Sequence, residues 1–113
     1  MAAISIINWH DCVIKKIVEI PEEDRLIFEV DYPVAWETGK YEVHYITFSG
    51  IYRYQIHEGP FSGPITITDF KIQEGPDAHG ATSYQMDTNA GYRIIKCRDI
   101  VLTKGTLEGY YLL

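Results

Sequence analysis

The densest group of reactive side chains lies near the start of the chain, in the run Trp9-His10-Asp11-Cys12. An imidazole, a carboxylate and a thiol this close together could bind a metal ion or transfer protons. A zinc site needs further ligands, and the remaining His and Cys residues show no paired spacing. A metal-dependent enzyme using His10, Asp11 and Cys12 is therefore the least favoured interpretation, and we expect neither a metal site nor a cofactor.

A structural role explains the same run. In this alternative, Trp9 fills one end of the core, and Asp11 accepts hydrogen bonds from backbone N–H groups where the chain enters a sheet. Other catalytic patterns are missing: Cys12 and Cys97 lie in strand-like segments, and there is no Gly-x-Ser-x-Gly elbow or glycine-rich phosphate loop. We expect a protein that is not an enzyme, with reduced thiols buried as small hydrophobic groups.

Aromatic residues are the other feature with functional content. Tyr and Trp are favoured at recognition surfaces, although core packing is their commoner use. Trp36 and Phe61 fall in predicted loops, where exposure is as expected as burial, and acids such as Glu37 lie close by. The sequence therefore proposes six binding residues: Trp9, His10, Asp11, Trp36, Glu37 and Phe61.

β-strands must position these residues, because apolar side chains recur with period two and not with helical spacing. In 25–32, Leu26, Phe28, Val30 and Tyr32 alternate with a mainly charged set. The turn 21–24 predicts that 12–20 and 25–32 pair as a hairpin, and Pro33 is expected to end the second strand. The other predicted strands are 41–48, continuing after a kink into 51–57, then 65–72, 81–87 and 92–102.

Two segments do not follow simple alternation. In 12–20, Ile14, Val18 and Ile20 share one face while Val13 and Ile17 share the other, which indicates a β-bulge or a strand covered on both sides. At the end of the chain, 110–113 are apolar enough that we expect them to pack on the body of the protein. The predicted fold is mainly β: one domain over 1–113, an antiparallel sandwich or partly open barrel of about six to eight strands.

Composition and charge exclude several classes of protein. Ten Lys and Arg against sixteen Asp and Glu give the 113-residue chain a formal charge of -6, and the basic residues are scattered. A nucleic-acid-binding surface is therefore not expected, because neutralising phosphates supplies most of that affinity. No apolar run approaches the roughly 20 residues of a membrane span, and the N-terminus lacks a signal-peptide pattern. The expected location is the cytoplasm.

Three segments resemble a group of small uncharacterised bacterial proteins. They are the opening 9–14, the strand 27–32 with Trp36-Glu37 after it, and the Cys-containing strand 95–102. Some members of this group are similar to immunity proteins of polymorphic toxin systems, which neutralise a toxin by binding it. The resemblance implies a binding role and no catalytic residues.

The sequence thus favours a non-catalytic binding protein whose acidic surface and loop aromatics recognise a basic, toxin-like protein. A homo-oligomer, in which a second copy caps exposed sheet edges, is the other partner considered. The alternative is a small-molecule-binding β-barrel with a pocket in its Tyr-rich interior. A core filled by Leu26, Phe28, Val30 and Ile94 would count against that alternative.

Overall fold

The computed structural model describes residues 7–104, with Trp36 described by its backbone alone. Eight strands form one antiparallel sheet in the order β4-β7-β6-β5-β1-β2-β3-β8. This confirms the predicted mainly β, antiparallel fold. The strands are β1 (Val13–Ile20), β2 (Arg25–Ala35), β3 (Lys40–Ser49), β4 (Arg53–Glu58), β5 (Ile65–Glu74), β6 (Thr82–Thr88), β7 (Gly91–Cys97) and β8 (Asp99–Lys104).

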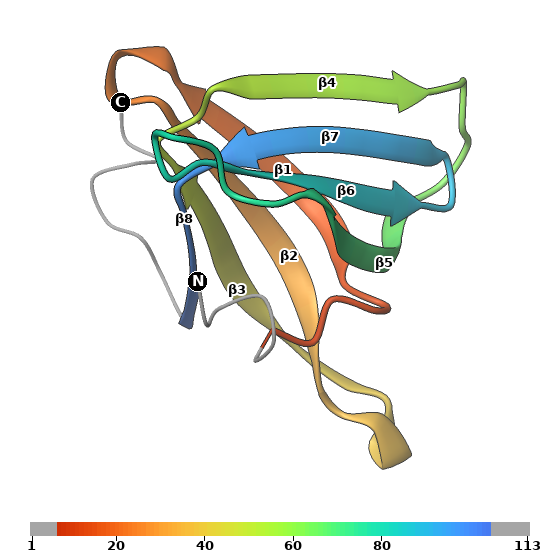
Figure 1. The fold of residues 1–113 in the computed structure, drawn as a ribbon. Coiled ribbons are helices and arrows are strands. Elements are labelled where there is room, and N and C mark those ends of the chain that lie inside the picture. The colour runs from red at the N-terminus through yellow and green to blue at the C-terminus, as the bar shows by residue number, and fades with distance from the viewer. Residues whose placement is uncertain (1–6, 105–113) are drawn as a thin grey trace.

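The sheet folds over on itself, so that its two halves face each other (Figure 1). We call β1, β2, β3 and β8 the β1 half, and β4, β5, β6 and β7 the β4 half. Two paired corners join the halves, where β3 leads into β4 and β7 leads into β8. The Arg98 N–H donates to the Ser49 carbonyl at 3.1 Å, and the Tyr52 N–H donates to the Lys96 carbonyl at 2.8 Å. The kink predicted between 41–48 and 51–57 is the corner where β3 leads into β4.

The core lies between the halves and takes side chains from both. Alternation directs every second residue of each strand inward, which is why the apolar set of β2 is buried together. Trp9 stacks on Phe70 of β5 with ring centroids 3.7 Å apart, and Phe28 packs edge-on against Phe48 at 5.2 Å. The buried core residues are Ile7, Trp9, Cys12, Leu26, Phe28, Val30, Tyr32, Ile46, Phe48, Ile67, Phe70, Tyr84, Met86, Ile95, Cys97 and Ile100.

A β-bulge in β1 explains its imperfect alternation. The register with β2 shifts between Ile14 and Lys16, so Ile14 and Ile17 both pack against the core. Val18 and Ile20 turn to the outer face, where they contact Ile27. The bulge was predicted correctly, but the grouping of Ile14 with Val18 and Ile20 was wrong, because the extra residue reverses the faces after it.

Pro33 does not end β2, contrary to the sequence prediction. The strand continues to Ala35 and pairs with β3, with Pro33 opposite Tyr41. The pairing of β1 with β2 stops at Asp31, so within the described part of the chain Pro33 has a neighbouring strand on one side only. A proline is tolerated there because its missing N–H breaks no ladder bond on the open side.

The predicted strand 92–102 is two strands, because the chain changes halves at Arg98. Ile94 is buried, as expected. It is only 5% exposed, but it lies on the outer face, opposite Gln55 and Gln85, while its neighbour Ile95 enters the core. The prediction for 110–113 falls outside the described residues. Within residues 7–104, no helix is long and apolar enough to cross a membrane.

Candidate binding surface

The run Trp9-His10-Asp11-Cys12 forms a tight turn ahead of β1. The Cys12 N–H donates to the Trp9 carbonyl at 3.2 Å, and Asp11 has φ +74°, a left-handed conformation that Asp adopts more readily than most residues. The turn directs Trp9 and Cys12 into the core and leaves His10 exposed. The geometry of the turn therefore explains why Trp9 and Cys12 stand at these positions. Trp9 lies in the core, as the structural alternative predicts.

The two thiols are in no position to act as nucleophiles. Cys12 and Cys97 are free and fully buried, and the Cys12 thiol donates to the Asn8 carbonyl at 3.1 Å. Burial raises the pKa of each thiol to about 12, and the carboxylates of Asp11 and Asp99 add to the effect. Thiolates, the reactive form, are therefore scarce near neutral pH.

The polar side chains of this turn form no metal site. His10 Nδ1 lies 3.2 Å from an Asp11 carboxylate oxygen, and both side chains face solvent. Among residues 7–104, no three His, Cys, Asp or Glu side chains are grouped so that they could hold a metal ion.

The end of the β2–β3 hairpin projects beyond the rest of the sheet (Figure 1). We call residues 32–42 the hairpin arm; its tip is a short 3-10 helix, Trp36–Thr38. Val34 and Tyr41 are 40% and 44% exposed on this arm. Glu37 is exposed at the tip.

An apolar row continues from the arm along the outer face of the β1 half. Alternation places Tyr41, Val43 and Tyr45 of β3 on this face, and Val101 of β8 lies opposite Thr47. Val43 and Val101 are 43% and 51% exposed. We call Tyr41, Val43, Tyr45 and Val101 the outer apolar row.

Acidic residues of β2 border the outer apolar row. On β2, Asp31 is opposite Val43, and Glu29 is opposite Tyr45. On β1, beyond β2, Lys15 lies 3.6 Å from Asp31 in a largely exposed ion pair. The outer face therefore presents an apolar row bordered by acids of β2.

The six residues proposed from the sequence do not form one site. Trp9 is in the core, His10 and Asp11 lie in the first turn, and Glu37 is at the tip of the hairpin arm beside the backbone of Trp36. Phe61 is 44% exposed in the loop between β4 and β5, in the other half of the sheet. Val43 and Val101 are not among the residues predicted from the sequence, although alternation along 41–45 puts Val43 on the same face as Tyr41 and Tyr45.

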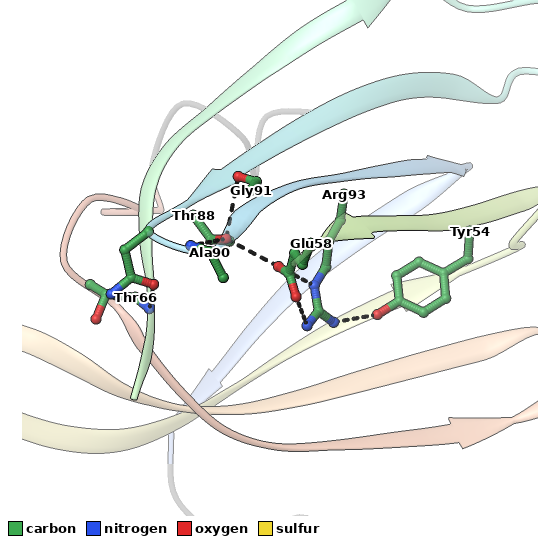
Figure 2. A network of polar contacts seen from close by, with 8 residues as sticks. Tyr54, Glu58, Thr66, Thr88, Ala90, Gly91 and Arg93 are labelled. Carbon is green, nitrogen blue, oxygen red and sulfur yellow. Dashed lines mark hydrogen bonds and ion pairs between the residues drawn. The ribbon is translucent and has the colours of Figure 1, made fainter. Parts of the chain in front are cut away.

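A buried ion pair in the β4 half was also missed (Figure 2). Arg93 of β7 donates from Nε and Nη2 to the two carboxylate oxygens of Glu58 of β4, at 2.8 and 2.7 Å, and both side chains are only 9% exposed. Arg93 Nη1 donates to the Tyr54 hydroxyl at 2.7 Å, and the Thr88 hydroxyl donates to Glu58 at 3.1 Å. The hydrogen bonds from Arg93 lower the pKa of Glu58, which therefore stays ionised.

This network has structural and not catalytic geometry. Each carboxylate oxygen of Glu58 already accepts a charged donor, so the group is a poor base. Burial raises the pKa of the Tyr54 hydroxyl, which keeps it protonated. The arrangement therefore fastens β4 to β7.

No protein-family model matches the chain, and no curated protein is significantly similar to it. The resemblance to immunity proteins stays a prediction, and the functional proposal depends on the surface chemistry described above.

Proposed function

We propose that this protein is a non-catalytic binding protein that recognises a partner protein through the outer apolar row and the adjoining hairpin arm. The observation that carries the proposal is the exposure of Tyr41, Val43 and Val101 on one continuous face, bordered by acids. Large apolar side chains lose little side-chain entropy relative to the area they bury, which makes them efficient binding anchors.

The charge of the chain favours a basic partner. Its net charge of -6 would steer a positively charged protein toward it, and Glu29 and Asp31 would face that partner at the border of the row. A basic protein toxin, such as a nuclease, has this chemistry. The resemblance to immunity proteins supports the same class of partner.

The small-molecule alternative receives less support. Leu26, Phe28 and Val30 are completely buried and pack with residues from the opposite half, so side chains fill the interior where a ligand would bind. We rank protein recognition above it for this reason, although Ile94, the fourth residue expected there, faces outward.

Binding can be tested with the product of a neighbouring toxin-like gene, or with a basic protein co-purified from the native host and then produced in pure form. Val43→Lys and Val101→Lys should each weaken the binding constant at least about tenfold, because a lysine would have to be desolvated next to an apolar contact. Ile72→Lys is the matched control, since Ile72 is 55% exposed on β5, in the other half. Equal binding by all three variants, or no partner for the wild-type protein, would contradict the proposal.

A further inference from the structure

Among residues 7–104, the strand β4 is an edge of the sheet and pairs with β7 alone. The Gly59 N–H donates to the Ala90 carbonyl at 3.2 Å, one residue beyond the end of this pairing. Hydrogen-bonded and non-hydrogen-bonded pairs alternate in an antiparallel ladder. Counting back from Gly59, every second residue of β4 therefore forms its backbone hydrogen bonds with β7. Tyr54, Ile56 and Glu58 therefore direct their backbone N–H and C=O groups toward the open edge, where another strand could bind.

Side-chain contacts hold this edge strand to β7. The buried ion pair of Glu58 with Arg93, and the hydrogen bond from Arg93 to Tyr54, attach two of these three residues to β7 (Figure 2). A partner strand would meet backbone groups already fixed in an extended conformation. Little conformational entropy would then be lost on binding.

Ile56 lies between these two anchored residues and is 54% exposed. Its side chain points to the same side of the sheet as Tyr54, because they are two residues apart on one strand. An exposed β-branched side chain on an open, regular edge is what native proteins usually avoid, since it favours pairing between chains.

We propose that β4 pairs with β4 of a second copy, in antiparallel orientation about a two-fold axis at Ile56. In this register, Ile56 meets Ile56 of the second copy, and Tyr54 lies opposite Glu58 of the second copy. On the other face, Gln55 lies opposite His57 of the second copy. The edge is self-complementary, as a two-fold interface requires.

The charges at this edge do not oppose a second copy, although the chain as a whole is acidic. The strand Arg53–Glu58 contains one acid, and that acid is neutralised by Arg93. The register brings no like-charged side chains opposite each other. The contact lies on the β4 half and does not include the outer apolar row, so it is independent of the proposed function.

Sedimentation velocity over a wide concentration range tests the dimer. A single strand-to-strand contact is smaller than standard interfaces of about 1,600 Å², so we expect a reversible, weak dimer in the wild-type protein. Ile56→Lys should raise its dissociation constant at least about tenfold, since edge lysines oppose pairing. Ile56→Pro should do the same while leaving the ladder with β7 intact, because the N–H it removes faces the open edge.

Cysteine cross-linking tests the register. Ile56→Cys places two Cα atoms about 5.5 Å apart across the axis, within disulfide range, whereas Gln55→Cys places them about 8 Å apart. Only the first variant should form a disulfide-linked dimer on mild oxidation. The wild-type protein is a clean background because Cys12 and Cys97 are buried.

Three results would overturn the proposal: a wild-type monomer at all concentrations, a dimer cross-linked by Gln55→Cys and not by Ile56→Cys, or a dimer weakened by Val101→Lys and not by Ile56→Lys. The last would assign self-association to the other edge strand, β8.

Discussion

Replacing Glu58 by Gln removes the negative charge of the buried ion pair and leaves the Arg93 guanidinium in place. Arg93 is 9% exposed and lies 6.0 Å from the centre of the Phe28 ring, so water cannot readily take over the role of the carboxylate. Breaking a buried pair by removing one partner costs about 3–5 kcal/mol. Two hydrogen bonds from Arg93, of 2.7 and 2.8 Å, are affected, and the amide of Gln can replace only one of their acceptors, so we expect about 3 kcal/mol.

Urea unfolding followed by fluorescence of the buried Trp9 measures this loss. The double variant Glu58→Leu with Arg93→Met should recover most of the stability and end within about 2 kcal/mol of the wild-type protein, because it leaves no unpaired buried charge. Lys71→Met is the exposed control: its ion pair with Asp87 spans 3.2 Å, the Lys71 side chain is 53% exposed, and its removal should cost less than about 1 kcal/mol.

The pH dependence gives a second, independent measurement. The pKa of Glu58 is lowered in the folded protein, so its contribution is fully present above the unfolded value of about 4.3 and is lost as the pH falls through the folded value. The stability difference between wild-type and Glu58→Gln should therefore shrink below about pH 4. A difference under about 1 kcal/mol at neutral pH, or one that does not change in acid, would refute the assignment of a desolvated ion pair.

Three further outcomes follow from the core and the turns. Trp9→Ala should lower the free energy of unfolding by about 4 kcal/mol in urea titration, because the ring stacks on Phe70; a cost under about 1 kcal/mol would contradict its burial. Gly91→Ala should cost about 3 kcal/mol by the same assay, since φ is +147° and a Cβ would collide with the His57 carbonyl, whereas Gly59→Ala meets open space and should be far milder. Cys12 and Cys97 should resist a thiol reagent in the native protein at pH 8 and react fully in urea; rapid native labelling would show that they are accessible.

Period-two patterning predicted the strands because it reports a local property, the burial of one face. It located the hairpin of β1 and β2 and the inward set of Leu26, Phe28 and Val30. It failed where the outcome depends on distant neighbours. Pro33 was expected to end a strand, yet β1 stops short of it and leaves an open side where proline is harmless.

The binding surface and the ion pair depend on strand order, which no local pattern encodes. Val43 and Val101 belong to strands far apart in the chain that become neighbours only when β8 pairs with β3. Glu58 and Arg93 are 35 positions apart and meet because β4 pairs with β7. Trp36 and Phe61 drew attention in the sequence because they are large and lie in loops, but that criterion says nothing about which side chains lie together.

The paired corners have a consequence for how the chain folds. A backbone hydrogen bond between Arg98 and Ser49 joins the two halves. Because β6, β7 and β8 all lie in the last third of the chain, neither half has all its strands until that part has been made. Contacts of such long sequence separation are slow to form, and they make the molecule assemble as one cooperative unit. During synthesis, β1, β2 and β3 would emerge from the ribosome first and wait with an unpaired edge until β8 follows.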